Sequence, residues 1–412
     1  MVRATLTPPD KKALIFVLAL GFALRLGWIL LVPSMPVSDA SVYHMLAQNM
    51  VATGNYAWPN GQMTSYWPVG APALYALSYI ALGSGTGAVA LNLLLGTVMI
   101  ALVYKLAREV EPRAALPAAL IMALWPAFIQ FTNFPNSELP FTVLLLGALA
   151  VRGRGSTTVL RSLAGVILLV GATYMRPIAL PLLFLLPMAG WIKHRRATVM
   201  AKDLGVSLAA AAILMTPWAL RNERLYGEPA LVSTNLGVNL WMGNNPASDG
   251  GFMTPPKKTG NEDQQDKAFR AEAMTFIKAE PGRYVVLTLN RVRKTFDRET
   301  SGVTWNPALP DKLVKPLKLL SSLFWWIVAS AALLGLTGWL RRDWRAVIDP
   351  LTLSPAVVVS TSVFIVASER YHMPVGPFAA IFAALLLARW NAPAFAPPAA
   401  APERLPRGSQ WV

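Results

Sequence analysis

Repeated apolar runs, most of them close to the roughly 17 to 25 residues that a helix needs to cross a bilayer, dominate the sequence. Hydrophobic residues make up 54% of the chain and charged residues 14%, whereas a soluble domain carries about 25% charged residues. This pattern predicts an all-α polytopic membrane protein and excludes an ordinary cytosolic enzyme, a disordered chain and a coiled coil. The runs lie at 13–32, 68–83, 86–107, 114–131, 138–151, 160–175, 177–192, 203–220, 317–340, 347–367 and 374–388.

The basic residues between these runs predict how the chain threads the membrane. Lys and Arg number 37 against 21 Asp and Glu. In a soluble protein this excess would indicate nucleic acid, but here it lies mostly in short loops, as positive-inside topology requires. If every run crossed, the basic loops 108–113 and 152–161 would face outside. If 68–83, which opens with two prolines and a glycine, lies on the outer surface, these loops fall inside. We therefore expect about ten spans, both termini inside, and no nucleic-acid partner.

This topology divides the chain into four parts. Residues 1–220 form an N-terminal transmembrane module, and its first outer loop, 33–85, carries the candidate chemistry. Residues 221–316 form a small outer region and 317–390 the C-terminal transmembrane helices. The Ala/Pro-rich tail, 391–412, is expected to be disordered and cytoplasmic.

The outer region 221–316 is predicted to contain two amphipathic helices. In the second, Arg291 and Lys294 lie off the apolar stripe. A basic amphipathic helix beside a bilayer usually lies on the interface, so we expect this helix there. The stripes are Phe269, Ala273, Phe276 and Ile277 in the first helix, and Val285, Leu289, Val292 and Phe296 in the second.

Polar side chains gather on the outer side of the predicted bundle. Arg25, in the outer half of the first run, is the clearest charge inside a span, and it could pair with a carboxylate or face a lipid phosphate. A transporter places ionisable residues along its pathway, whereas here the acidic residues collect at outer helix ends and in outer loops. This distribution suits a reaction at the outer membrane surface better than passage through the bundle.

Asp39 follows the first run closely and can begin a helix, because Val42, Met45 and Leu46 continue at helical spacing. One interpretation is an N-cap, in which Ser38 or Asp39 accepts hydrogen bonds from free backbone N–H groups. The other is a general base, which needs a carboxylate within hydrogen-bond reach of an acceptor hydroxyl or amine. Spacing alone slightly favours the cap.

Seven segments, taken in order, resemble one family. The chain up to about Arg389 resembles the GT-C glycosyltransferases, in particular the bacterial branch related to protein O-mannosyltransferases and the lipid A aminoarabinose transferase. This resemblance implies a GT-C-type helix bundle with surface helices in its first outer loop. The segments are Asp39-Ala-Ser-Val-Tyr43-His44-Met-Leu-Ala47, Gly54-Asn-Tyr56, Tyr66-Trp67-Pro68-Val-Gly70-Ala-Pro72, Pro135-Asn-Ser-Glu138-Leu, Tyr174-Met-Arg176-Pro177, 235–246 and Glu369-Arg370-Tyr371-His372-Met-Pro374.

The resemblance implies an inverting glycosyltransferase that uses a sugar on a polyprenyl phosphate. Asp39 would be the catalytic base, and polyprenyl phosphate would leave as the acceptor attacks the anomeric carbon. Arg370 is the first candidate for the leaving phosphate, since Arg matches its oxygens in bidentate geometry. Its alternatives are an ion pair with a neighbouring carboxylate, such as Glu369, or an anchor in the interface. The acceptor could be a glycan, a lipid or a protein.

Two further charged residues are candidates for substrate binding. Glu138 begins a span and is either a first-turn carboxylate favoured by the helix dipole or a contact to the acceptor. Arg176 precedes Pro177, so it could pair with Glu138, with a carbonyl freed by the proline, or with substrate.

Uncharged and aromatic candidates complete the predicted site. Tyr43 and His44 belong to the first-loop motif, and His44 and His372 could each shuttle a proton or be structural. Trp241 and Asn244 could stack on a sugar and hydrogen-bond to it, with a plain structural turn as the alternative.

The sequence also departs from the family pattern. Ala40 stands where a second acid often follows, and Tyr66-Trp67-Pro68-Val69 lacks the usual arginine. The first loop has no D-x-D pair to hold a metal. The chain has no cysteine, which excludes disulfides and thiolate metal sites. We therefore predict neither an essential metal nor another cofactor.

Two other function classes compete with the transferase. A transporter or flippase of lipid-linked sugars predicts ionisable residues along the bundle and internal symmetry, and neither is visible. A polymerase of such sugars would share the long outer loop, but we would not expect it to share the Asp39 loop. The resemblance to bacterial members places the protein in an inner membrane, with its site on the periplasmic side.

Reporter fusions test the topology. A reporter after Gly87 should report the outside and one after Arg113 the inside, because only a surface position for 68–83 puts the basic loops inside. The opposite result at either point would contradict the ten-span arrangement.

Overall fold

The computed structural model describes residues 8–153, 158–194 and 197–390. The tail 391–412, expected to be disordered, lies outside these residues. The described chain contains no β-strand, which confirms the prediction of an all-α membrane fold.

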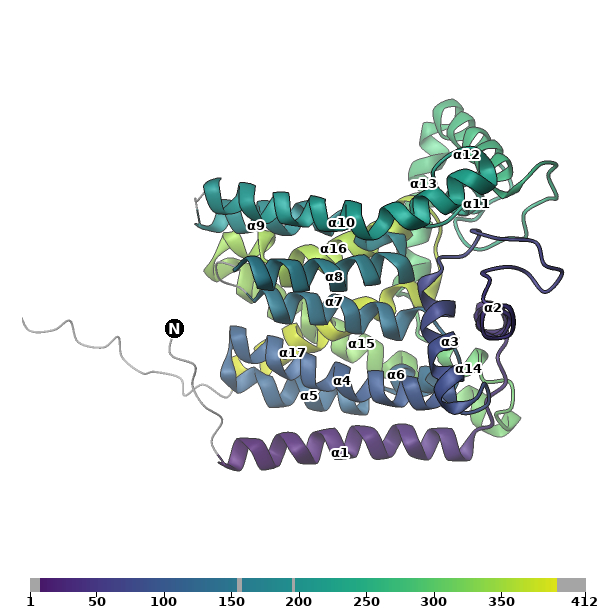
Figure 1. The fold of residues 1–412 in the computed structure, drawn as a ribbon. Coiled ribbons are helices and arrows are strands. Elements are labelled where there is room, and N and C mark those ends of the chain that lie inside the picture. Colours follow the sequence, from purple (N-terminus) through teal and green to yellow (C-terminus); the bar gives the residue numbers. More distant parts are fainter. Residues whose placement is uncertain (1–7, 154–157, 195–196, 391–412) are drawn as a thin grey trace, which may run out of the picture.

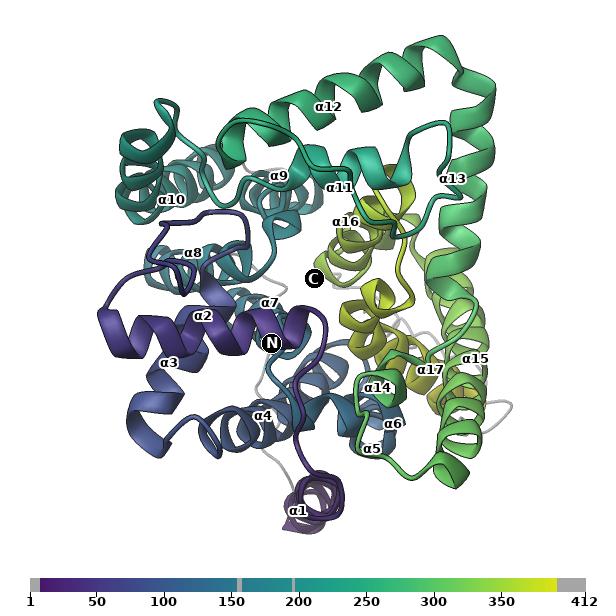
Figure 2. The same cartoon turned by 90° about the vertical axis from the view of Figure 1, so that its right-hand side faces the viewer.

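Most helices lie along one another and form a bundle, whereas the others gather at one end of it, called here the outer end (Figure 1). Figure 2 faces this end. The bundle helices are α1 (Pro8–Leu31), α4 (Gly87–Val110), α5 (Ala115–Leu124), α6 (Pro126–Gln130), α7 (Glu138–Arg152), α8 (Val159–Met175), α9 (Leu182–His194), α10 (Ala197–Tyr226), α15 (Asp311–Arg342), α16 (Pro350–Phe364) and α17 (Gly376–Trp390). At the outer end are α2 (Asp39–Thr53), α3 (Gly70–Leu82), α11 (Leu236–Gly243), α12 (Glu262–Ala279), α13 (Pro281–Phe296) and α14 (Ser301–Thr304).

Five helices of the described chain are long and apolar enough to cross a membrane, and a bent pair would make a sixth. Shorter apolar helices include Val159–Met175 and Pro350–Phe364. The run 68–83 forms α3, which lies across the end of the bundle rather than along it (Figure 1). This position agrees with the predicted surface helix, and the count of ten spans stays a prediction.

Two helices extend beyond the apolar runs that predicted them. α15 begins at Asp311 and α10 continues to Tyr226, so the segment between them is shorter than the expected 221–316. The helices extend because Lys and Arg are good helix formers even where the apolar run has ended. Pro310, the N-cap residue of α15, marks its start.

The apolar run 114–131 is not one helix. α5 ends at Leu124, and the chain bends by 54° before it continues in α6. Pro126 explains the break, because proline has no N–H to donate to the carbonyl of Met122, four residues earlier, and its ring clashes with that carbonyl.

Arg25 satisfies the carbonyl groups at this break. Its Nη2 donates to Met122 O at 3.2 Å and its Nη1 to Ala123 O at 3.3 Å. Gly96 provides the space, since a Cβ there would lie 2.6 Å from Arg25 Nε. The partners of Arg25 are therefore backbone carbonyls of the bundle. This corrects the expectation of a carboxylate or a lipid phosphate.

The core of the bundle surrounds α17, which is apolar on every side. Phe378, Ile381 and Ala384 are buried, and α15 packs closely on α17 because Gly335 has no Cβ to meet the Phe382 carbonyl. This packing fixes α17 and with it the 3-10 helix η5 (Glu369–Val375), which precedes it at the outer end.

Arg25→Met should destabilise the protein, because it leaves the carbonyl of Met122 without a donor in an apolar setting. A buried acceptor left unsatisfied costs about 1–3 kcal/mol. The thermal midpoint in detergent should fall, whereas the exposed Arg161→Met, the same substitution, should leave it unchanged. Equal midpoints for both variants would show that Arg25 does not support the break.

Candidate active site

Four charged side chains meet at the outer end of the bundle, although they come from distant parts of the sequence. Asp39 is the first residue of α2, Glu138 the first of α7, Arg176 follows α8, and Arg370 lies in η5. All four are residues that the sequence analysis selected. The structure places them side by side, and they are called the charge cluster below.

Opposite charges alternate through the charge cluster. Arg370 Nη2 contacts Asp39 Oδ2, and Arg370 Nη1 lies 3.4 Å from Glu138 Oε1. Arg176 Nη1 lies 2.7 Å from the same Glu138 oxygen. Glu138 is fully buried, while the side chains of Asp39, Arg370 and Arg176 remain 15%, 13% and 17% exposed. The cluster is thus anchored by a buried carboxylate, and its other three side chains are partly exposed.

The loop before α7 holds Glu138 in place. The Asn136 side chain accepts from the N–H of Leu139 at 2.9 Å and donates to the Phe131 and Phe134 carbonyls. The Tyr75 hydroxyl donates to the Asn136 carbonyl at 3.0 Å. These contacts satisfy backbone groups of the buried turn and hold the turn in one conformation. Glu138 therefore has little freedom to move away from the two arginines.

Aromatic rings orient the two arginines. The Arg370 guanidinium carbon lies 4.6 Å from the ring centroid of Trp305 and 5.4 Å from that of Tyr371. Arg176 lies 5.0 Å from the same Tyr371 ring. Cation–π contacts favour a guanidinium over the face of a ring, so both arginines are held over Tyr371.

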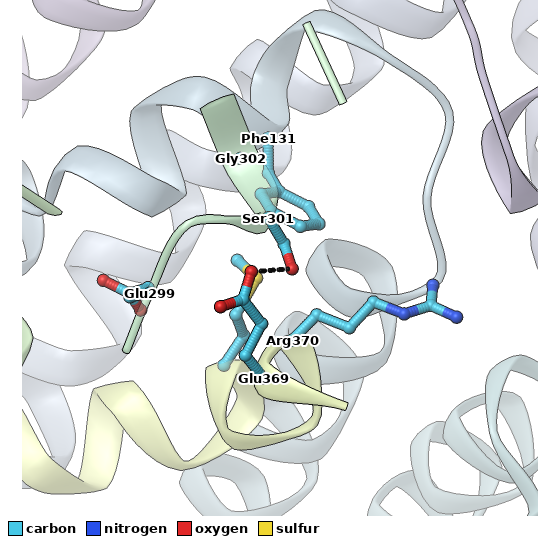
Figure 3. A pocket seen from close by; sticks show the side chains of 7 residues that line it. Phe131, Glu299, Ser301, Gly302, Glu369 and Arg370 are labelled. Carbon is cyan, nitrogen blue, oxygen red and sulfur yellow. Dashed lines mark hydrogen bonds between the residues drawn. The ribbon is translucent and has the colours of Figure 1, made fainter. Parts of the chain in front are cut away.

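Glu369 does not pair with its neighbour Arg370. The ion-pair alternative for Arg370 holds with other carboxylates, those of Asp39 and Glu138. The Glu369 carboxylate accepts from Thr300 Oγ1 at 2.8 Å and Ser301 Oγ at 2.7 Å. Figure 3 shows Glu369 turned toward Ser301 and Arg370 pointing away, beside a small hollow. The hollow is lined by Phe131, Glu299, Ser301, Gly302, Glu369, Arg370 and Met373.

His372 is buried beneath the charge cluster. Its Nδ1 lies 2.6 Å from the Thr295 carbonyl and its Nε2 3.2 Å from Glu299 Oε1, while its ring stacks on Trp325 at 4.1 Å. Glu299 also accepts from Trp125 Nε1 at 2.8 Å. These contacts hold η5 against α13 and α15. They agree with the structural alternative for His372.

Asp39 is not used as a helix cap. The N-cap residue of α2 is Ser38, at φ 53°, and its side chain makes no cap hydrogen bond within the described chain. The Asp39 carboxylate contacts Arg370 instead. The geometry therefore argues against the cap that spacing preferred, and the role of Asp39 as a base stays a prediction.

Tyr43 lies next to the charge cluster. Its hydroxyl donates to Ser137 Oγ at 3.5 Å, and its ring meets Trp67 edge-on at 5.7 Å. Burial, together with the nearby carboxylates of Asp39 and Glu138, raises the pKa of Tyr43. The phenol therefore stays protonated and acts as a hydrogen-bond donor.

Three other predicted residues are not brought to the charge cluster. His44 Nδ1 lies 2.8 Å from the Tyr79 hydroxyl, and partial burial lowers the pKa of His44, which favours the neutral ring. Trp241 packs on Phe269 at 5.3 Å. Asn244 donates to the Ile365 carbonyl and accepts from Arg291 Nη1 at 2.9 Å. Their substrate-binding roles stay predictions.

Glu262, which the sequence analysis did not select, ties the two outer loops together. Its Oε1 accepts from Trp58 Nε1 at 3.1 Å and Thr64 Oγ1 at 2.7 Å, and its Oε2 from the Ser65 N–H at 2.9 Å. The capping pair Asn261 and Gln264 marks this helix start in the sequence. No sequence pattern names these three partners, because they lie 197 to 204 residues away.

Metal ligands were not expected, and the described residues hold no group of three or more His, Cys, Asp or Glu side chains placed to bind a metal ion.

Solved structures share this fold. The archaeal oligosaccharyltransferase AglB from Archaeoglobus fulgidus, in complex with an inhibitory peptide and a dolichol-phosphate, gives a TM-score of 0.56 at 15% identity, over 93% of this chain and 51% of that chain. The Archaeoglobus fulgidus enzyme in complex with Zn and sulfate gives 0.53 at 17% identity, over 90% and 49%. ArnT from Cupriavidus metallidurans in the apo state gives 0.44 at 15%, over 91% and 77%.

The two likenesses with TM-scores above 0.5 confirm the predicted fold class: the chain has the GT-C fold of membrane glycosyltransferases. It spans about half the length of the oligosaccharyltransferases that it matches. No protein-family model and no curated protein sequence matches it.

Glu138→Gln should strongly destabilise the outer end, because Arg176 would lose its carboxylate partner and Arg370 would keep only that of Asp39. Breaking a buried ion pair by removing one partner costs about 3–5 kcal/mol. The double variant Glu138→Gln/Arg176→Gln should recover part of the loss, since it restores charge balance in the cluster.

Thermal unfolding in detergent measures these changes. Glu272→Gln is the control, because Glu272 forms an exposed pair with Lys258 and such pairs contribute little. A Glu138→Gln midpoint equal to that of this control would contradict the anchoring role of Glu138.

Proposed function

We propose that this chain is a glycosyltransferase that moves a sugar from a polyprenyl-phosphate donor to an acceptor at the outer face of the membrane, with inversion at the anomeric carbon. The observation that carries the proposal is the charge cluster at the outer end of an apolar bundle, in which the partly exposed carboxylate of Asp39 contacts Arg370, and Arg370 and Arg176 both pair with the buried Glu138. A lipid donor reaches such a place from the bilayer, and a polar acceptor reaches it from water.

Asp39 acts as the general base in this proposal. Its Oδ2 faces Arg370, and its Oδ1 takes the proton from the acceptor hydroxyl. The acceptor oxygen then attacks the anomeric carbon on the side opposite the phosphate. The bond between that carbon and the phosphate oxygen breaks, and the polyprenyl phosphate leaves with its electron pair.

The arginines stabilise the leaving phosphate. A guanidinium carries five N–H donors, and two nitrogens of Arg370 contact Asp39 and Glu138, so donors remain for phosphate oxygens. Preorganised donors at a site of developing charge lower the barrier without reorganisation during the reaction. Glu138 and the ring of Tyr371 provide this preorganisation for both arginines.

The fold relatives agree with a lipid donor. The matching AglB structure holds a dolichol-phosphate and a peptide, and we propose a polyprenyl phosphate and a glycan, lipid or protein acceptor for this chain. Its place would be a bacterial inner membrane with the cluster on the periplasmic side. Comparing glycans and glycolipids by mass spectrometry, in cells with and without the gene, identifies the product and with it the sugar and acceptor.

Asp39→Asn should lower product formation by about 10² to 10⁴, because it removes the basic carboxylate while preserving side-chain volume. Product per amount of membrane-inserted protein is the measurement. Asp249→Asn is the matched control, since Asp249 pairs with Lys294 away from the charge cluster and its side chain is 70% exposed. That variant should retain full activity.

Near wild-type product from Asp39→Asn would reject Asp39 as the base and make Glu138 the next carboxylate to test. A flippase of lipid-linked sugars makes no new covalent product. Mass spectra that show only a redistributed lipid-linked sugar would therefore favour that alternative over the transferase.

A further inference from the structure

Helix α13 exposes its apolar face and buries a charged residue, the opposite of what water favours. Its outward face carries Val285, Val286, Leu289 and Val292, which are 56%, 46%, 65% and 37% exposed. Its inward face carries Leu287, Arg291 and Thr295, all buried. A surface helix in water turns its apolar stripe to the core and its charges to solvent. The outward face of α13 therefore matches an apolar environment.

Arg291 prevents α13 from rotating its apolar stripe inward. Its guanidinium donates to the Val363 carbonyl at 2.9 Å, the Gly243 carbonyl at 2.8 Å and Thr288 Oγ1 at 2.7 Å. Turning the helix would break these bonds and leave buried carbonyls unpaired, which is costly. The exposed apolar stripe is thus fixed by the packing of its opposite face.

The contacts of its last turn place α13 at the depth of the lipid surface. Phe296 stacks on Trp325 of α15 at 6.2 Å, and Trp326 Nε1 donates to the Asp297 carbonyl at 2.5 Å. Fifteen residues separate Trp326 from Arg341, at the other end of α15, and they span about 22 Å. A hydrocarbon core is about 30 Å thick. If Arg341 lies at one edge of this core, Trp326 lies inside the core, close to the opposite edge.

The orientation of α13 and its neighbours agree with this depth. Figure 2 views the bundle end-on. In this view α13 runs down the right-hand edge of the molecule toward α15, so its axis lies across the bundle axis. The end of α13 contacts α15 through Trp326. There, Leu323, Trp326 and Ile327 of α15 are exposed on a helix long and apolar enough to cross a membrane. These exposed side chains and the stripe of α13 therefore face the same lipid.

Charge identifies the lipid surface as the occupant rather than a second copy of the chain. α13 contains four basic residues and no acidic one, in the sequence PGRYVVLTLNRVRKTF. Of these, Arg283 and Arg293 are exposed beside the apolar stripe. Two copies meeting through this face would bring like charges together, whereas basic residues flanking an apolar stripe match anionic lipid headgroups.

We propose that α13 lies in the outer lipid–water interface, with Val285, Val286, Leu289 and Val292 among the acyl chains and Arg283 and Arg293 at the headgroups. This inference is independent of the proposed function. Because the Thr295 carbonyl of α13 binds His372, the lipid-seated helix braces η5, the segment that carries Arg370.

The absence of cysteine from the sequence makes site-directed spin labelling a clean test. Leu289→Cys and, as a second position, Val285→Cys are labelled with a nitroxide in nanodiscs of phosphatidylethanolamine and phosphatidylglycerol. Ile327→Cys on α15 is the lipid-facing reference, and Ala271→Cys, exposed on α12, is the water-facing control. Accessibility to oxygen, which concentrates in lipid, is compared with accessibility to a water-soluble nickel chelate.

The oxygen-to-nickel ratio at positions 289 and 285 should resemble that at Ile327→Cys and exceed that at Ala271→Cys several-fold. A ratio equal to that of Ala271→Cys at both positions would overturn the proposal. Spin–spin broadening at position 289 that disappears on dilution with unlabelled protein would overturn it in favour of a contact between two copies.

Discussion

The buried carboxylate of Glu138 is the interaction on which the outer end of this protein depends. A fully buried charge is tolerated only when it is paired and hydrogen-bonded, and Glu138 meets that condition through Arg176 and Arg370. These arginines come from segments that lie 38 and 232 residues further along the chain. The need to pair one carboxylate therefore joins α7, α8 and η5, and it brings Arg370 to Asp39.

The same requirement explains the features that surround the charge cluster. Within an apolar bundle each backbone carbonyl needs a donor, and Arg25 supplies one where Pro126 removes it. At the outer end Glu262 gathers donors from the first outer loop. The bundle and the two outer loops thus form one scaffold, in which buried polar groups decide the relative positions of elements that apolar packing alone would leave free to slide.

Helix α13 links this scaffold to the bilayer. Arg291 satisfies carbonyls of α11 and α16, while the carbonyl of Thr295 reaches His372 beside Arg370. If the outward stripe is seated in lipid, the membrane itself supports the position of η5. The arginine proposed to bind the donor phosphate, Arg370, would then keep a fixed position relative to the lipid surface from which the donor arrives.

The sequence by itself determined the helical membrane fold, the departure of 68–83 from the direction of the bundle and the identity of the four clustered charges, because apolar run length, loop charge and ordered motifs are local signals. It did not identify Arg25 as the donor to the carbonyls at the Pro126 break, nor Arg291 as the buried residue that holds the α13 stripe outward. The pairing of Asp39 with Arg370, and the choice of Thr300 and Ser301 for Glu369, were decided only by tertiary structure. Contacts between residues hundreds of positions apart depend on how helices pack, and no local pattern records that packing.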